Sequence, residues 1–250
     1  MSSIGFIGTG HISAPMARAL ARDGHDVWTS ERNAVLSAEL SASHGVRVAP
    51  NQQVVDAVEI VILCLRPNVA RDVIEELSFR ADQHIVSVIA GLTEADLRLI
   101  CAPVTGFSIT IPIGFIEHGG CPLPAYPDAS VLGPLFGARN PVIPVDSEQA
   151  MLAHFGITAL LPGLLALMDT GAKWLAERTG DADGADRYTA QLVQGFLTDM
   201  TKGEGALARE WSALATEGTL SLQMVDALDD AHTTETLRRT MDKIADRVGA

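Results

Sequence analysis

Hydrophobic and polar positions along the first half of the chain predict strands and helices in turn. Short apolar runs at residues 4–7, 59–65 and 85–89 are typical of strands that are covered on both faces. Between them, residues 13–22 and 34–43 carry apolar side chains at helical spacing. This alternation predicts a doubly wound parallel sheet with helices on both faces, the α/β class.

The pattern changes in the middle of the chain. Seven of the twelve prolines fall between Pro112 and Pro144, and because proline is excluded from central strands and helix interiors, we expect edge strands and loops there. After residue 147 the apolar spacing is helical to the end. We therefore predict an α/β domain over residues 1–147 and an all-α domain over residues 148–250.

A glycine-rich turn follows the first predicted strand and opens the first helix. Gly8 permits a tight turn, Gly10 lets a pyrophosphate approach the main chain, and Ser13 is small where helix and strand must pack closely. The helix N-terminus adds free N–H groups and the positive end of a dipole. We predict that Gly8, Gly10, His11 and Ile12 hold the pyrophosphate of a dinucleotide.

The end of the second strand bears on the choice of dinucleotide. Ser30 and Arg32 suit the 2′-phosphate of NADP, whereas Glu31 suits the ribose diol of NAD. We predict NADP, with NAD as the alternative. Ligands of doubly wound sheets lie at the carboxyl ends of the strands. Further cofactor contacts are therefore expected on the adenosine side from Leu65, Arg66 and Pro67, and near the nicotinamide from Ala90 and Gly91.

These segments together resemble the pyrroline-5-carboxylate reductase family. Residues 4–10, 66–68 and 86–93 carry the resemblance in the order of that family, and it extends over nearly the whole chain. It implies a Rossmann domain followed by a helical domain that interlocks two subunits in a homodimer or higher oligomer. It also implies that a small-molecule substrate lies at the dimer interface, and that a hydride passes from a reduced nicotinamide to the C=N bond of a cyclic imine.

The substrate motifs of that family are altered here. Residues 111–115 replace its Met-Pro-Asn-Thr-Pro segment, and residues 216–221 replace its Ser-Pro-Gly-Gly-Thr-Thr loop, keeping one glycine and some hydroxyls. Thr219 and Ser221 are the candidates for anchoring a substrate carboxylate, although Thr219 equally suits a helix N-cap. A related reductase that acts on a substrate other than a proline precursor is therefore an alternative.

Two other functions are compatible with the sequence. Residues 14–17, 24–27 and 101–106 resemble the β-hydroxyacid dehydrogenases, which depend on a lysine that exchanges a proton with the substrate oxygen. Lys173 is the nearest candidate, although it lacks the glycine spacing and the following asparagine of that motif and also suits a solvated helix face. The altered substrate motifs are compatible with a non-catalytic dinucleotide-binding protein as well.

The charge and the cysteine content limit which partners and which cellular compartment we expect. The chain has 18 Lys and Arg against 31 Asp and Glu, a formal charge of −13, so a nucleic-acid backbone would be repelled. Its three cysteines are far apart in sequence, which excludes a disulfide scaffold and indicates a reducing, cytoplasmic location.

Two segments call for separate consideration as membrane and metal sites. Residues 149–168 carry no formal charge, but they include Pro162 and several polar residues, so we predict a helix covered by neighbours or by a second subunit and no membrane span. Glu117, His118 and Cys121 share one loop, yet zinc needs about four ligands at recognisable spacing, so no metal site is predicted.

Overall fold

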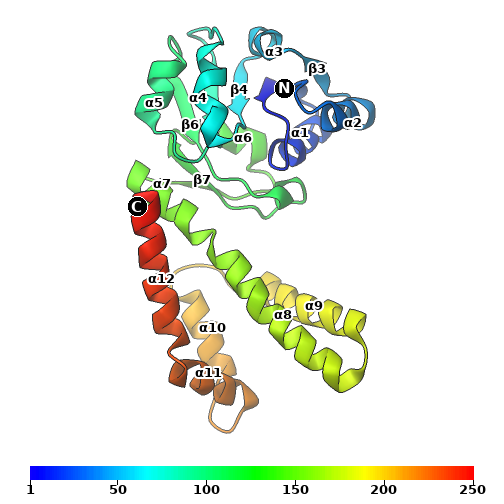
Figure 1. Cartoon of the computed structure of the whole chain (residues 1–250), viewed down its shortest axis with the longest axis vertical. Coiled ribbons are helices and arrows are strands. Elements are labelled where there is room, and N and C mark those ends of the chain that lie inside the picture. The colour runs from blue at the N-terminus through cyan, green and yellow to red at the C-terminus, as the bar shows by residue number, and fades with distance from the viewer. The chain divides into compact units, whose positions relative to one another are not determined.

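A computed structural model describes residues 1–250, and the chain divides into two compact units. The first unit comprises Met1–Phe155 with Val248–Ala250, and the second Gly156–Arg247. In Figure 1, Met1–Phe155 runs from blue to green and Gly156–Arg247 from green to red. The first unit extends past the boundary predicted at residue 147 because helix α7 (Glu148–Ile157) contributes Met151 to its core.

The first unit is built on one sheet of eight strands in the order β3-β2-β1-β4-β5-β6-β7-β8. The strands are β1 (Ser3–Ile7), β2 (Asp26–Ser30), β3 (Arg47–Ala49), β4 (Ile60–Leu63), β5 (His84–Ser87), β6 (Gly106–Ile109), β7 (Leu123–Pro127) and β8 (Val142–Pro144). All neighbours pair in parallel except β6 and β7, which are antiparallel. The predicted doubly wound sheet is confirmed.

Helices cover both faces of this sheet. They are α1 (Ser13–Arg22), α2 (Ala34–His44), α3 (Asn51–Ala57), α4 (Pro67–Glu75), α5 (Glu94–Ile100), the 3₁₀ helix η1 (Gly114–Glu117) and α6 (Leu132–Phe136). Because successive strand residues point to opposite faces, Ile85 belongs to the hydrophobic core with α4 and α5, and Val86 to the core with α1, η1 and α6. Because both faces of the sheet are covered, the first strands are unbroken apolar runs in the sequence.

The proline-rich middle forms the edge of the sheet, as predicted, with strands β7 and β8. The loop before β7 is fixed to α1 and to the core by polar contacts. Arg18 Nε donates to Glu117 Oε2 at 2.8 Å, and the buried Asn140 side chain accepts from the Cys121 amide and donates to the Ile116 carbonyl. The loop thus has a defined position beside the first helix.

The second unit is helical throughout, as predicted. Its helices are α8 (Leu160–Thr179), α9 (Ala182–Asp199), α10 (Ala206–Leu214), α11 (Leu220–Asp230) and α12 (Thr233–Val248). Helices α8 and α9 pack side by side (Figure 1) after a short turn in which the Asp181 side chain accepts from the Gly184 amide. By length and composition, Glu148–Thr179 is one helical stretch that could cross a membrane, and 11% of its most apolar window is buried.

Candidate functional site

The turn after β1 requires glycine at its first position. Gly8 has φ +100°, and a Cβ atom there would collide with the Cys64 carbonyl oxygen at the end of β4. The Gly8 amide donates to Ser30 Oγ at 3.0 Å. The turn is thus packed against the end of β4 on one side and hydrogen-bonded to the end of β2 on the other.

The main chain that follows is open to a ligand. A Cβ atom on Gly10 would meet no other atom within 4 Å. The Gly10 amide donates to Ser13 Oγ at 2.6 Å, but the amides of Thr9, His11 and Ile12 donate to no acceptor in the protein. Unpaired amides at a helix N-terminus are the donors that a pyrophosphate needs. The turn therefore fits the group that the sequence predicts for it.

The structure corrects the role expected for Ser30. This residue is 1% exposed, and its hydroxyl accepts from Gly8 rather than facing a phosphate. Thr9 Oγ1 donates to the Ser30 carbonyl at 2.7 Å, and Asn33 Nδ2 donates to the Thr9 carbonyl at 3.4 Å. Ser30 thus holds the turn in shape, and Arg32 is the remaining candidate for the 2′-phosphate on this loop.

Arg32 and Arg66 differ from every other arginine of the first unit. Residues 1–155 contain no lysine, and the other arginines of this unit all form ion pairs: Arg18, Arg22, Arg47, Arg71, Arg80, Arg98 and Arg139. Arg32 follows β2 and Arg66 follows β4, so these two exposed residues follow the strands on either side of β1. Unpaired arginines in this position suit a phosphate.

The other predicted cofactor residues share this edge of the sheet. A Cβ on Gly8 would lie 3.1 Å from Leu65 Cδ2, and Arg66 is the N-cap residue of α4, with Pro67 in its first turn. Ala90 and Gly91 follow β5, and no atom lies within 4 Å of a Cβ built on Gly91. Since β1, β4 and β5 are parallel neighbours, the structure brings these predicted residues together at their carboxyl ends.

The segment after β6 reaches the same edge and contains a residue that the sequence reasoning missed. Thr110 is 2% exposed, and its Oγ1 has no hydrogen-bond partner. Farther along, a Cβ on Gly114 would lie 3.8 Å from the His11 carbonyl oxygen, so this segment adjoins the glycine turn. A polar residue directly after a buried strand was the signal that could have identified Thr110.

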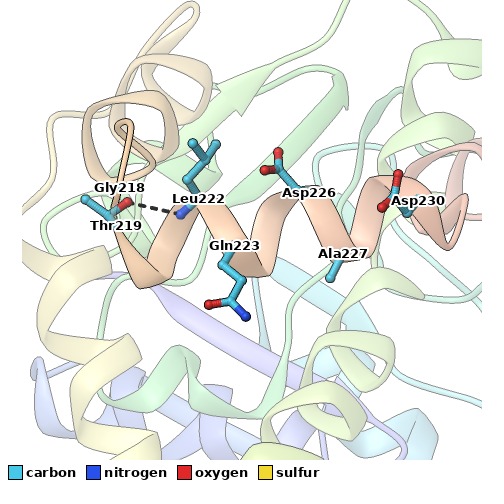
Figure 2. A pocket seen from close by; sticks show the side chains of 7 residues that line it. All are labelled: Gly218, Thr219, Leu222, Gln223, Asp226, Ala227 and Asp230. Atoms are coloured by element: carbon cyan, nitrogen blue, oxygen red, sulfur yellow. Dashed lines mark hydrogen bonds between the residues drawn. The ribbon is translucent and has the colours of Figure 1, made fainter.

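The candidate substrate residues lie in the second unit. Thr219 is the N-cap residue of α11: its Oγ1 accepts from the Leu222 amide at 3.1 Å and donates to the Thr216 carbonyl at 2.7 Å. Ser221 is exposed. Figure 2 shows the hollow along α11, whose lining includes the carboxylates of Asp226 and Asp230. The capping role predicted as one alternative for Thr219 is therefore present in the structure.

Lys173 has the environment of a solvated helix residue. Its side chain is 73% exposed and its Nζ lies 2.7 Å from Asp169 Oδ2, one helical turn away. The hydrogen bond and the charge of Asp169 raise the pKa of Lys173, which is opposite to the shift that a proton-accepting lysine needs. The geometry does not support a role in proton transfer.

The loop considered for zinc has other structural roles. Glu117 pairs with Arg18, and the buried Cys121 Sγ accepts from the Ile113 amide at 3.4 Å. Burial also raises the pKa of the Cys121 thiol, so the thiolate that zinc binds is disfavoured. No group of three or more His, Cys, Asp or Glu side chains is arranged to hold a metal ion.

The fold and the turn together define a class: a Rossmann domain of the dinucleotide-binding kind followed by a helical domain. Residues 3–91 match the family model described as NADP oxidoreductase, coenzyme F420-dependent. A comparison with curated proteins gives no match.

Solved structures extend the likeness to the whole chain. The pyrroline-5-carboxylate reductase of Streptococcus pyogenes superposes with a TM-score of 0.84 at 18% identity, over 99% of this chain and 98% of that one. The pyrroline carboxylate reductase of Plasmodium falciparum, solved with NADP bound, gives 0.82 at 11% identity, over 99% and 97%. An imine reductase of Aspergillus terreus gives 0.59 at 18% identity, over 100% and 88%.

The resemblance stated from the sequence is therefore confirmed. By fold, and by the family model over its N-terminal part, the chain is similar to the NAD(P)-dependent oxidoreductases of the pyrroline-5-carboxylate reductase type.

Proposed function

We propose that this protein is an NADPH-dependent reductase that transfers a hydride to the C=N bond of a small imine. The observation that carries the proposal is the glycine turn, whose amides at Thr9, His11 and Ile12 are unpaired at the start of α1. The fold it shares with pyrroline-5-carboxylate reductases and an imine reductase supports the reaction class.

The preference for NADPH rests on Arg32 and Arg66. These guanidinium groups carry charge that no carboxylate neutralises, and the two residues follow the strands on either side of β1. NADP differs from NAD by one phosphate on the adenosine ribose, and a charge-assisted hydrogen bond contributes about 1.5–3 kcal/mol. Arg32 is the closer match to the residue that receives this phosphate, because it follows β2.

Titration of the Arg32→Ala variant with both dinucleotides tests this preference. The dissociation constant for NADPH should rise roughly 10- to 100-fold, while that for NADH changes less than about twofold. Arg47→Ala is the matched control, because it removes an arginine that is already paired with Asp26 and lies over the Trp28 ring. Equal losses for the two dinucleotides would exclude Arg32 as the phosphate ligand.

The nicotinamide, when bound, supplies the hydride, and the chain positions it. Gly8, Gly10, His11 and Ile12 would hold the pyrophosphate, and Gly91 would leave room for the ring after β5. Residues 88–93 and 110–116, at the ends of β5 and β6, contain no ionisable side chain, so these two segments offer no ionisable proton donor. We propose that the substrate arrives as a protonated iminium ion, with Ser221 as the remaining hydroxyl available to a substrate carboxylate.

We propose that the second unit forms a homodimer. Its buried hydrophobic residues are few, namely Ala172, Ala185, Met200 and Ala206, whereas a domain of this length normally buries a substantial core. Leucines on α8 and aromatic residues on α9 and α10 are exposed instead: Leu161, Leu164, Leu165, Leu167, Phe196 and Trp211. A second copy presents an identical apolar surface and would cover them.

Light scattering after size exclusion tests the dimer. The wild type should have twice the chain mass, and Leu164→Glu should shift it toward the monomer. Leu99→Glu on α5, where an isolated leucine is 73% exposed, should have no effect. Sedimentation of the wild type with phospholipid vesicles, or a monomeric wild type, would contradict the dimer.

Turnover distinguishes the reductase from the two other functions. The absorbance of NADPH should fall with cyclic imines and not with 2-keto acids. Oxidation of 3-hydroxy acids that is abolished by Lys173→Ala would favour a β-hydroxyacid dehydrogenase, and tight binding without turnover of any substrate would favour a non-catalytic protein.

We also propose a cytoplasmic location, since Cys64, Cys101 and Cys121 are all unpaired. Fractionation of the source cells would test it, and recovery with an oxidising compartment would contradict it.

A further inference from the structure

The glycine turn carries one side chain that can gain a charge near neutral pH. His11 is exposed, and its main-chain amide is one of those left unpaired at the start of α1. Its imidazole takes part in no hydrogen bond and in no ion pair. Histidine is the side chain that ordinarily changes its charge between about pH 5 and 8. The charge of His11 is therefore free to respond to a ligand at the turn.

The charged groups on neighbouring elements do not neutralise His11. Arg18, about two turns farther along α1, pairs with Glu39 of α2 and with Glu117 of η1. Segment 110–116, which adjoins the turn, contains no ionisable side chain. The other titratable groups on this side of the unit lie just after β2, β4 and η1, namely Glu31, Arg32, Arg66 and His118. None of them forms an ion pair with His11, so a bound anion would be its first charged partner.

The place of His11 in the turn limits how far its imidazole can be from a ligand there. A phosphate oxygen bonded to the His11 amide would lie about 3 Å from that nitrogen. Bond lengths keep an imidazole nitrogen within about 6 Å of its own amide, so the two groups are within about 9 Å of each other in any rotamer. Over that distance in water, one positive and two negative charges change an affinity about fivefold. Salt lowers this factor, and a closer approach raises it.

We propose that binding of the dinucleotide pyrophosphate is coupled to protonation of the His11 imidazole. This inference rests on the proposed function, in which the turn holds the pyrophosphate. The proton comes from solvent and is bound by a ring nitrogen of His11, and no covalent bond to the ligand forms. The negative charges of the pyrophosphate favour the imidazolium form, so the bound state takes up a proton near neutral pH. The affinity for the cofactor therefore falls as the pH rises, until the imidazole is neutral in both the free and the bound state.

The ratio of the NADPH dissociation constants of His11→Asn and the wild type tests the proposal. Asparagine keeps a polar side chain at this position but cannot carry the charge. The dissociation constant of His11→Asn should be about three- to tenfold higher than that of the wild type at about pH 6, and the two should be equal within about twofold at about pH 8.5. The 2′-phosphate of NADPH also titrates at about pH 6, but its effect cancels from the ratio because both proteins receive the same ligand.

Two further variants separate the charge of His11 from its shape. His11→Lys keeps a positive charge throughout this pH range, so it should bind NADPH more tightly than His11→Asn at both pH values. His25→Asn is the matched control: His25 precedes β2, at the amino ends of the strands, where its Nδ1 accepts from the Ser2 amide. Its ratio to the wild type should not change with pH. Isothermal titration at about pH 7 in buffers of different ionisation enthalpy should show that the wild type takes up more protons than His11→Asn on binding NADPH.

Each other outcome overturns the proposal. A ratio that is the same at both pH values would show that the charge of His11 does not act on the cofactor, and so would equal affinities of His11→Lys and His11→Asn. A clearly lower melting temperature of ligand-free His11→Asn would show that the imidazole is needed to form the turn itself. NADPH binding with a ratio independent of pH would leave the proposed function standing and remove only this role of His11. If the wild type does not bind NADPH at either pH, the proposed function fails, and this inference fails with it.

Discussion

Replacing Ser30 by alanine tests whether this residue shapes the dinucleotide turn or binds a phosphate. The Ser30 hydroxyl accepts the Gly8 amide at 3.0 Å, and Ser30 is 1% exposed. Alanine removes the acceptor and leaves a buried N–H group unpaired. An unpaired buried donor costs about 1–3 kcal/mol, so we expect the free energy of unfolding of the first unit to fall by about that amount.

The effect on ligands should not depend on the 2′-phosphate. In the proposed function the turn holds the pyrophosphate, so Ser30→Ala should weaken the binding of NADPH and of NADH by the same factor, about three- to tenfold, as part of that free energy is needed to reform the turn on binding. Urea denaturation gives the stability, and isothermal titration gives the two affinities.

Ser37→Ala is the matched control for this prediction. Ser37 is 2% exposed, and its hydroxyl donates to the Asn33 carbonyl, which already accepts from the Ser37 amide. Its loss should change stability by no more than about 0.5 kcal/mol and affinity not at all. A Ser30→Ala protein of normal stability that loses affinity for NADPH alone would refute the reasoning, since Ser30 would then face the phosphate.

Four further outcomes follow from the structure. Gly8→Ala should fail to fold normally, because its Cβ would collide with a main-chain carbonyl, as soluble yield and circular dichroism would show. Gly10→Val should keep the fold and melting temperature of the wild type, since nothing lies near its Cβ, yet lose binding of either dinucleotide in a titration. Burial lowers the pKa of His84; the unfolded chain then binds the proton more readily, so stability should fall as the pH drops below about 6.5. Denaturation of His84→Gln across this range should show a shallower decline. Lys173→Ala should leave turnover unchanged, because its ammonium group is exposed and ion-paired; a large loss would favour the β-hydroxyacid dehydrogenase reading.

The order of strands and helices in the first unit could be predicted from the sequence because its signals are local. Strands covered on both faces are continuous apolar runs, and the glycine turn has to follow the first of them. The parallel arrangement then places the ends of β1, β2, β4 and β5 at one edge. For this reason the residues predicted around the turn lie together in the structure.

The direction of individual side chains could not be predicted in the same way. Ser30 and Arg32 are near neighbours in sequence and both suit a phosphate, yet Ser30 points inward to Gly8 and Arg32 is exposed. Nor does the sequence show which cations are already neutralised. The separation of Arg32 and Arg66 from the paired arginines depends on contacts between residues far apart in the chain, such as Arg18 with Glu117.

The boundary between the units and the role of Thr219 also could not be predicted from the sequence alone. Helix α7 begins where the helical pattern begins, but whether it packs with the first unit depends on tertiary contacts such as those of Met151. A threonine before a helix suits both a cap and a ligand, and only the structure shows that Thr219 Oγ1 already accepts from Leu222 and donates to Thr216.

The central claim is that the unpaired amides after β1, together with the free arginines beside them, bind a phosphorylated dinucleotide. Isothermal titration of the wild-type protein with NADPH measures this directly. One NADPH should bind per chain, more tightly than NADH. Absence of binding for both NADPH and NADH would contradict the claim.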